Sequence, residues 1–416
     1  MKTMSARFAA TLTLLSAAGA LGQGLKTPPP LRPKAAVAAL ALGDNEFAFD
    51  LYARLAAGKN KNAFFSPYSI SSAMAMAYAG ARGRTAREMA DTLRFGLAQG
   101  ELPKAFSAMN RSLDDRRGGA RLVVANALWR QKGAPFLRGF LELTRRYYGA
   151  ALRELDFRAN AEKARAAINA WVEKETSGKI RNLIPAGALK QSTRLVITDA
   201  VYFKAAWAFP FEKNRTTPAP FYTAPGESVR APFMKQTGPF AYAESRVLQI
   251  VKLPYAGGLS MIVILPRANG GLPAMEKNLT AENALGLIGI LSRRRVSVFL
   301  PKFKESSAFG MVPVLSSMGM ADAFARPSPG GKGADFSGMD GRRDLWISGV
   351  AHKAFIDVDE HGTEAAAATA ATMRATAVFS PGPPTTFRAD HPFVFLIQDD
   401  ASGAVLFLGK VENPEL

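Results

Sequence analysis

The side chains best suited to acid-base chemistry or metal binding are scarce in this chain. Its histidines are His352, His361 and His391, and it has no cysteine. Spacings of 9 residues (352 to 361) and 30 residues (361 to 391) match no helical or finger-type zinc pattern. No serine lies in G-x-S-x-G, and neither the P-loop pattern nor G-x-G-x-x-G occurs. We expect no metal and no cofactor; a triad assembled from distant residues stays open, but no motif supports one.

A long segment of small residues is the most unusual feature of the sequence. Residues 357–384 (DVDEHGTEAAAATAATMRATAVFSPGPP) lie between two apolar, strand-like runs. By propensity, Glu364 to Met373 favours helix, so an alanine-rich helix or a flexible linker is one interpretation. However, the segment has almost no large apolar residue with which to pack, and a long loop in a compact domain is usually functional or disordered. Small residues also suit a segment that is exposed in one state and inserts between strands in another.

The N-terminal residues indicate export. Lys2 and Arg7 precede an apolar stretch at 8–22, in which Ala18-Gly19-Ala20 fits a cleavage site. The stretch is shorter and more interrupted than the ~20 apolar residues of a membrane anchor. We therefore predict a signal peptide at 1–20 and a secreted protein, extracellular or periplasmic, without a membrane anchor. Repeated proline favours an extended linker at 21–34, and the folded domain is expected at 35–416.

The composition predicts a globular domain with a basic surface. Of 416 residues, 48% are hydrophobic and 21% are charged, which is enough apolar material for a sizeable core. The net charge of +19 favours polyanions or acidic partners through long-range attraction. A polyanion site requires that the fold gather the basic clusters on one face; a solvated basic surface is the alternative. These clusters are Arg116-Arg117, Arg145-Arg146, Arg293-Arg294-Arg295 and Arg342-Arg343.

Helical patterns come mostly before strand patterns, which predicts an α+β fold rather than a βαβ repeat. Helices are expected at 35–57, after Ser66-Pro67, and at 161–176. Ser66 can cap the second helix, and Pro67 can take its first position. The strand-like runs, rich in β-branched and aromatic residues, are 195–203, 249–253, 260–265, 295–300, 354–358, 393–397 and 404–408.

A series of motifs from about Ala35 to Pro414 resembles the serpin family. Each motif alone is weak, but their order is highly specific. The motifs are Asn62-Ala63-Phe64-Phe65-Ser66-Pro67-Tyr68-Ser69-Ile70, Asn126-Ala127-Leu128-Trp129, Ile168-Asn169-Ala170-Trp171, Thr176-Ser177-Gly178-Lys179-Ile180, Tyr202-Phe203-Lys204-Ala205-Ala206-Trp207, Leu253-Pro254-Tyr255, Leu300-Pro301-Lys302-Phe303, His352-Lys353-Ala354, Glu360-His361-Gly362-Thr363-Glu364-Ala365-Ala366-Ala367-Ala368-Thr369, Asp390-His391-Pro392-Phe393 and Gly409-Lys410-Val411.

The resemblance implies a fold of three β-sheets and eight or nine helices, with an exposed reactive-centre loop. It also implies a protein that is not an enzyme but an irreversible suicide inhibitor of serine proteases, and a monomer. In that family the protease attacks the loop and forms an acyl-enzyme. The cleaved loop then inserts into the central sheet and traps the protease, a switch that releases stored strain.

The resemblance assigns the hinge of the loop to residues of the small-residue segment. Gly362 permits the turn, and Thr363, Ala365, Ala367 and Thr369 would alternate onto the core-facing side. Their small side chains favour an inhibitor; bulky or charged ones would favour the alternative, a non-inhibitory binding or chaperone-like relative. The hinge residues are Glu360, Gly362, Thr363, Glu364, Ala365, Ala366, Ala367, Ala368 and Thr369.

Two counts place the scissile bond differently. Fifteen residues from Gly362 inclusive, as in typical inhibitory members, end at Thr376 and place the bond between Thr376 and Ala377. Counting back from Phe387 places it after Phe379 instead, and Arg374 is a third candidate. We favour the hinge count, because insertion length sets where the protease is pulled. Thr376 suggests elastase-like or subtilisin-like targets, Phe379 chymotrypsin-like ones and Arg374 trypsin-like ones.

The resemblance also carries over two supporting sites. Trp207, Lys302 and Glu360 correspond to the region where the loop first enters the sheet, and a Lys302–Glu360 ion pair is expected. Ser66, Ser69, Asp199 and His352 match the cluster beneath the sheet's opening. The chain departs from the family by having Asp199 in place of a common asparagine and Ala205 in place of a common glycine. Asp199 should favour the charged imidazolium of His352, because an opposite charge stabilises the charged form.

Overall fold

Two hydrogen-bonded sheets and ten α-helices make up the part of the chain that this computed structural model describes, which confirms the predicted α+β class. Eight or nine helices were expected; the described ten include short ones such as α10, which has four residues. The described residues are 33–57, 62–114, 120–149, 151–328, 330–364 and 382–415, all within one compact unit, residues 32–416. The α-helices are α1 Pro33–Leu55, α2 Pro67–Tyr78, α3 Gly83–Thr92, α4 Leu102–Asp114, α5 Arg138–Tyr148, α6 Ala161–Glu175, α7 Leu272–Glu276, α8 Ala281–Gly289, α9 Met311–Ser317 and α10 Ser337–Asp340. The 3-10 helices are η1 Lys213–Arg215 and η2 Asp322–Phe324.

The predicted helices form close to their predicted bounds. α1 begins at Pro33, inside the predicted linker, because proline is tolerated at the first position of a helix. The Ser66 side chain accepts a hydrogen bond from the Ser69 N–H and caps α2, whose residues are all buried. α6 is capped in the same way by Asn160. The predicted signal peptide lies outside the described residues.

The larger sheet has nine strands. Their order is β1 Ala63–Phe65, β15 Val405–Val411, β14 Phe393–Asp399, β8 Leu259–Pro266, β7 Leu248–Pro254, β6 Glu227–Glu244, β9 Ser292–Pro301 and β13 Thr385–Arg388, with β5 Thr217–Ala224 paired to β6. β6 is 18 residues long and pairs with β5, β9 and β7 at successive parts of its length. Because β6 pairs with all three of these strands, they belong to one continuous nine-stranded sheet. The described strands therefore form two separate sheets, whereas three were expected.

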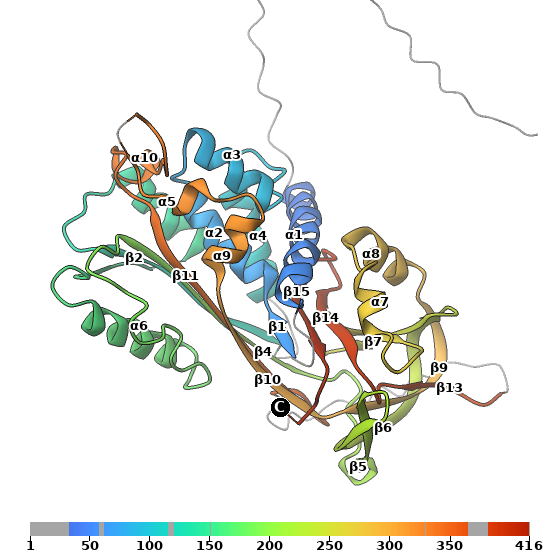
Figure 1. Ribbon diagram of the computed structural model, residues 1–416. Coiled ribbons are helices and arrows are strands. Elements are labelled where there is room, and N and C mark those ends of the chain that lie inside the picture. The colour runs from blue at the N-terminus through green and yellow to red at the C-terminus, as the bar shows by residue number, and fades with distance from the viewer. Residues whose placement is uncertain are drawn as a thin grey trace, which may run out of the picture. The chain divides into compact units, whose positions relative to one another are not determined.

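The smaller, six-stranded sheet carries the segment of interest (Figure 1). Its order is β10 Phe303–Gly310, β11 Ile347–Asp359, β12 Gly362–Thr363, β4 Leu195–Ala206, β2 Arg121–Gln131 and β3 Ala151–Leu155. β11 and β4 also pair directly and in parallel, from Ile347–Leu195 to Phe355–Tyr202. Beyond that point the two strands separate and β12 lies between them.

Hydrophobic side chains cover both faces of the six-stranded sheet. Along β4, Ile197, Val201 and Phe203 belong to the main core, whereas Val196, Ala200 and Tyr202 belong to a second cluster with Ile168 and Val172 of α6. Figure 1 shows α6 on the opposite side of β2 and β11 from the helices α2, α4 and α5. Successive side chains of β4 point to opposite faces of the sheet, and both faces are covered by hydrophobic clusters. This explains why the sequence of β4 is a continuous apolar run and not an amphipathic one.

None of the helices within the described ranges combines the length and the apolar character that crossing a membrane requires.

Candidate functional site

The start of the predicted loop already lies inside the six-stranded sheet. Gly362 and Thr363 pair antiparallel with Asp359 and Val358 of β11 on one side, and with Ala206 and Ala205 of β4 on the other. β12 is therefore a short third strand between two strands that pair directly with each other farther along. This is the opening of the sheet.

Gly362 is held where no side chain fits. Its φ is +149°, a conformation that L residues rarely adopt, and a Cβ atom would lie 2.1 Å from the Ala205 carbonyl oxygen. It would also lie 2.8 Å from the Ala206 Cα. The contact is with backbone, which cannot move aside as a flexible side chain does. Glycine is therefore required here by close approach as well as by φ.

Thr363 is fully buried and points toward an aromatic pair. Its Oγ1 lies 2.7 Å from the hydroxyl oxygen of Tyr255, and the Tyr255 ring stacks on Trp207 at 4.2 Å between centroids. Burial raises the pKa of the Tyr255 hydroxyl, so this group remains a proton donor at neutral pH. The inward position predicted for Thr363 is thus occupied by a small residue whose one polar atom is satisfied.

The turn between β11 and β12 is fixed by backbone hydrogen bonds. The Trp207 N–H donates to the His361 carbonyl at 2.9 Å, and its indole Nε1 donates to the Asp359 carbonyl at 2.9 Å. The Phe211 N–H donates to the Glu360 carbonyl at 2.9 Å. The Asp359 carboxylate in turn accepts from the His361 N–H at 2.8 Å. Trp207 therefore fixes the backbone of the turn that follows β11.

The predicted ion pair between Lys302 and Glu360 is present. Lys302 Nζ donates to Glu360 Oε2 at 2.9 Å, and the Thr216 hydroxyl donates to Oε1 at 2.8 Å. The Glu360 side chain is 4% exposed and that of Lys302 34%. Burial alone would raise the pKa of Glu360, but the hydrogen bonds from Lys302, the Glu360 backbone and Thr216 together hold it below its ordinary value. The site therefore keeps Glu360 ionised.

Glu364, the last described residue before the gap, is tied to the segment that follows α6. Its Oε1 lies 2.8 Å from Lys179 Nζ, and its N–H donates to the Asp357 carbonyl at 2.8 Å. Its φ is +47°, uncommon for a residue other than glycine. Lys179 also lies over the Phe355 ring, at the last direct pair between β11 and β4. The backbone hydrogen bond to Asp357 and the Lys179 ion pair thus hold Glu364 beside β11.

The four residues predicted beneath the opening form one buried hydrogen-bonded cluster. Ser69 Oγ donates to Asp199 Oδ1 at 2.6 Å, and His352 Nδ1 lies 2.9 Å from Asp199 Oδ2. The Ser66 N–H donates to His352 Nε2 at 3.2 Å, and Ser66 Oγ donates to the Leu406 carbonyl at 2.7 Å. Asp199 and His352 are direct partners in the β4–β11 ladder. The cluster therefore joins α2 to β4 and β11, the two strands between which β12 lies.

The geometry contradicts the expected imidazolium at His352. Nε2 accepts the Ser66 N–H, so this nitrogen carries a lone pair and Nδ1 carries the proton that is donated to Asp199. A charged ring has N–H groups at both positions and would point one of them at the Ser66 N–H. The expectation considered Asp199 alone, whereas the second partner of the ring comes from α2.

The remaining predicted loop residues lie outside the described residues. These are Ala365, Ala366, Ala367, Ala368 and Thr369, together with the candidate scissile positions Arg374, Thr376, Ala377 and Phe379. Within the described ranges, no three His, Asp or Glu side chains come together as a metal site.

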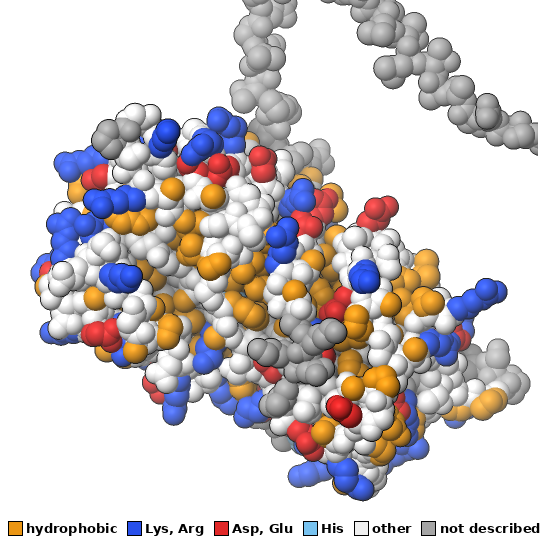
Figure 2. Space-filling model, in the orientation of Figure 1, with side chains coloured by type: hydrophobic (Ala, Val, Ile, Leu, Met, Phe, Trp, Pro, Cys, Tyr) orange, Lys and Arg blue, Asp and Glu red, His pale blue; other side chains and the backbone are white. Residues whose placement is uncertain are grey.

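The basic clusters do not form one patch in the part of the chain that is described. Arg145-Arg146 lie on α5, Arg293-Arg294-Arg295 on β9, and Arg342-Arg343 between α10 and β11. Figure 2 shows basic side chains spread over the visible face among neutral and acidic ones. A long polyanion lying along a single basic stripe is therefore not favoured by this face.

Three contacting residues were not assigned to the site from the sequence. Tyr255 binds Thr363, Thr216 binds Glu360, and Lys179 binds Glu364. Tyr255 and Lys179 lie in the motifs that carry the family resemblance, but nothing in those motifs shows what their side chains touch. Thr216 lies in no such motif, so only the structure reveals it.

Known proteins resemble this chain over most of its length. Residues 43–414 match the serpin family, described as serine protease inhibitor. An uncharacterised serpin-like protein of Thermococcus kodakarensis is 41% identical over 373 residues, 89% of this chain and 85% of that protein. Human leukocyte elastase inhibitor is 38% identical over 387 residues, 90% of this chain and 99% of that protein.

The fold resembles solved structures to a similar extent. The crystal structure of human thyroxine-binding globulin matches with a TM-score of 0.81 at 30% identity, covering 91% of this chain and 99% of that one. The relatives thus include one named for inhibition of a protease and one named for binding a small molecule.

Proposed function

This chain belongs to the serpin family, a family of protease inhibitors and not of enzymes, and from that premise we propose that it is an irreversible suicide inhibitor of serine proteases. The target protease cleaves the loop that follows Glu364 and forms an acyl-enzyme. The loop then inserts between β4 and β11 and traps the protease before the ester is hydrolysed. The alternative is a non-inhibitory serpin with a binding or chaperone-like role.

The observation that carries the proposal is the position of β12. Gly362 and Thr363 lie between β11 and β4 and pair antiparallel with both. The first two residues of the loop thus already occupy the position that an inserted strand would extend. The next inward positions are Ala365, Ala367 and Thr369, and residues of this size enter a sheet without displacing the core. A binding protein with a static loop needs neither feature.

The register of β12 sets the length of an inserted strand. In the antiparallel pairs 362–359 and 363–358, each residue forward on β12 faces one residue back on β11. Continued in this register, residue 374 would lie opposite Ile347, the first residue of β11. The same rule applied to the antiparallel pair 362–206 places residue 373 opposite Leu195, the first residue of β4. A loop cut after Thr376 is therefore long enough to fill the whole space, with two residues to spare. Cuts after Arg374 and Phe379 meet the same length, so the register agrees with the Thr376–Ala377 bond, which the count from Gly362 selects.

Backbone hydrogen bonds supply the driving force. Insertion replaces the direct parallel pairing of β4 with β11 by two antiparallel ladders, which are slightly more stable per residue. About ten additional bonds at about 0.5–1.5 kcal/mol each give a release on the order of 10 kcal/mol. That is comparable to the whole stability of a typical domain.

The candidate target classes follow from the residue before the scissile bond. Thr376 is small and uncharged, which favours elastase-like or subtilisin-like proteases, and the relative named leukocyte elastase inhibitor is consistent with this. Cleavage after Phe379 or Arg374 would instead select chymotrypsin-like or trypsin-like enzymes. The predicted signal peptide at 1–20 completes the proposal: a secreted monomer that acts on proteases outside the cell.

Incubation with a protease panel tests the proposal directly. An inhibitor yields a covalent complex that survives denaturing electrophoresis, and mass spectrometry of the released C-terminal peptide identifies the scissile bond. Thr376→Pro, which blocks cleavage at that bond, should abolish the complex with an elastase-like protease. Cleavage without any stable complex across the panel would favour the non-inhibitory alternative.

A further inference from the structure

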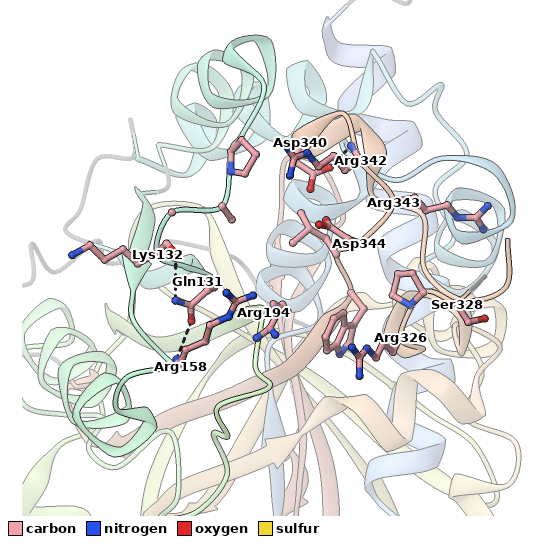
Figure 3. Close-up of a pocket in the computed structure, with 16 residues that line it drawn as sticks. Gln131, Lys132, Arg158, Arg194, Arg326, Ser328, Asp340, Arg342, Arg343 and Asp344 are labelled. Carbon is pink, nitrogen blue, oxygen red and sulfur yellow. Dashed lines mark hydrogen bonds between the residues drawn. The ribbon is translucent and has the colours of Figure 1, made fainter. Parts of the chain in front are cut away.

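A polar pocket of about 580 Å³ lies at the end of the six-stranded sheet remote from β12. It is lined by the turn after β2, by Arg158, by Arg194 just before β4, by Arg326 and by residues 340–346 before β11. Figure 3 shows Arg158 and Arg194 close together on one side and Arg326 on the other. The pocket is separate from the loop hinge and from the cluster beneath the sheet opening.

The cations that face this pocket lack carboxylate partners. Within the described ranges, no ion pair is formed by Arg158, Arg194, Arg326 or Arg342. Arg343, by contrast, points away from the others and pairs with Asp335 at 3.7 Å. The pocket therefore concentrates positive charge that the protein does not neutralise.

The acidic residues at the rim are too few to neutralise these arginines. Asp340 accepts a hydrogen bond from the Arg342 backbone N–H at 2.7 Å. Burial, together with the neighbouring Asp344, raises the pKa of Asp340 to about 6. Asp340 and Asp344 are the two acidic side chains among the described residues that line the pocket, against the guanidinium groups of Arg158, Arg194, Arg326 and Arg342.

The arginines also affect one another. Burial lowers the pKa of Arg194, the nearby charges of Arg158 and Arg326 lower it further, and the nearby Asp344 carboxylate opposes this shift. Arg194 and Arg326 both lie over the Trp346 ring, at 5.7 and 5.6 Å from its centroid. The Trp346 indole thus brings two guanidinium groups to the same side chain, and their attraction to the ring offsets part of their mutual repulsion.

We propose that this pocket binds a compact polyanion that carries several phosphate or sulfate groups. Planar guanidinium groups match such oxyanions with paired hydrogen bonds, and most of the cations that line the cavity are arginines, with Lys132 as the one lysine among the described lining residues. The bounded volume selects a small molecule or the end of a chain rather than the length of a polymer. The site does not depend on protease inhibition, so either proposal can fail without the other.

Calorimetric titration of the full chain with sodium tripolyphosphate and, separately, with sucrose octasulfate tests the proposal. Binding of either probe with a stoichiometry near one supports it, and the stronger probe identifies phosphate or sulfate as the preferred group. Arg326→Gln and Arg158→Gln should each weaken binding roughly tenfold, the loss of one charge-assisted contact. Both side chains are exposed, so these variants should fold normally, and a thermal melt checks this.

Arg293→Gln is the matched control, because Arg293 is an exposed arginine on β9 in another part of the chain. It should bind the probes as the wild type does. Equal weakening by Arg293→Gln and Arg326→Gln would show general attraction to a basic surface and overturn the proposal. Absence of binding to both probes at low ionic strength would overturn it as well.

Discussion

The hydroxyl oxygens of Thr363 and Tyr255 lie 2.7 Å apart, and the Tyr255 ring stacks on the Trp207 ring. This contact fixes Thr363, the first inward residue predicted for the loop, between β11 and β4. It also fixes the register in which the rest of the loop would follow.

Thr363→Arg is expected to abolish inhibition while the loop is still cleaved. The side chain at 363 is fully buried, and a charge there has no partner, so the inserted strand cannot form at normal speed. Complex formation and substrate turnover with a susceptible protease measure the two outcomes. Thr386→Arg, at an exposed threonine on β13, is the control and should inhibit normally. Wild-type stoichiometry in Thr363→Arg would exclude insertion through this gap.

Cleavage of the loop by a protease that is not trapped should raise the melting temperature substantially. The inserted strand adds two antiparallel ladders to the sheet at the expense of one parallel ladder. Calorimetry of cut and uncut protein measures the change, with protease-treated Thr363→Arg as the control that cannot insert. Equal melting temperatures for cut and uncut wild type would argue for a non-inhibitory serpin.

Loss of the Lys302–Glu360 pair should destabilise the protein in a pH-dependent way. Glu360→Gln is expected to cost about 1–2 kcal/mol at pH 7, the range of one hydrogen bond to a charged group at a partly exposed site. The folded pKa of Glu360 lies below its ordinary value of 4.5, so its contribution is fully present above pH 4.5. It is lost as the pH falls through the folded pKa.

Urea unfolding of wild type and Glu360→Gln at pH 7 and below pH 4 checks this prediction. The difference between the two proteins should shrink at the lower pH. Glu212→Gln is the control, because the Glu212 side chain is 65% exposed and its Arg215 partner is 3.5 Å away. A difference that grows as the pH falls would contradict the assigned role of the ion pair.

His352 should be found as the neutral tautomer that carries its proton on Nδ1. Nitrogen chemical shifts of the imidazole at pH 7 distinguish this form, since only Nε2 then has an unprotonated shift. In Asp199→Asn the amide can accept from Ser69 or from His352, but not from both through two carboxylate oxygens. We expect the free energy of unfolding of Asp199→Asn to fall by about 1–3 kcal/mol, the cost of leaving one buried polar group unsatisfied. Asp91→Asn, at an exposed position of α3, should have little effect. A protonated Nε2 in the wild type would contradict the tautomer.

Three of the helices and several of the buried strands were predictable from the sequence because local physics controls them. Ser66 and Pro67 start α2 through a cap and a first-turn proline, and apolar runs such as 260–265 become buried strands. The motif order was equally informative, since residues 43–414 match one family. The Lys302–Glu360 pair was predictable only through that resemblance, because 58 residues separate the two side chains.

Tertiary structure alone decided the features that depend on residues distant in sequence. The tautomer of His352 is set by a backbone N–H 286 residues away, so a neighbouring aspartate could not predict it. Gly362 is required by the Ala205 carbonyl of another strand. The arginine pocket joins Arg158, Arg194 and Arg326, and none of these lies in a cluster visible in the sequence. Local sequence specifies backbone propensities, whereas hydrogen-bond partners and electrostatic neighbours exist only after folding has brought separate segments together.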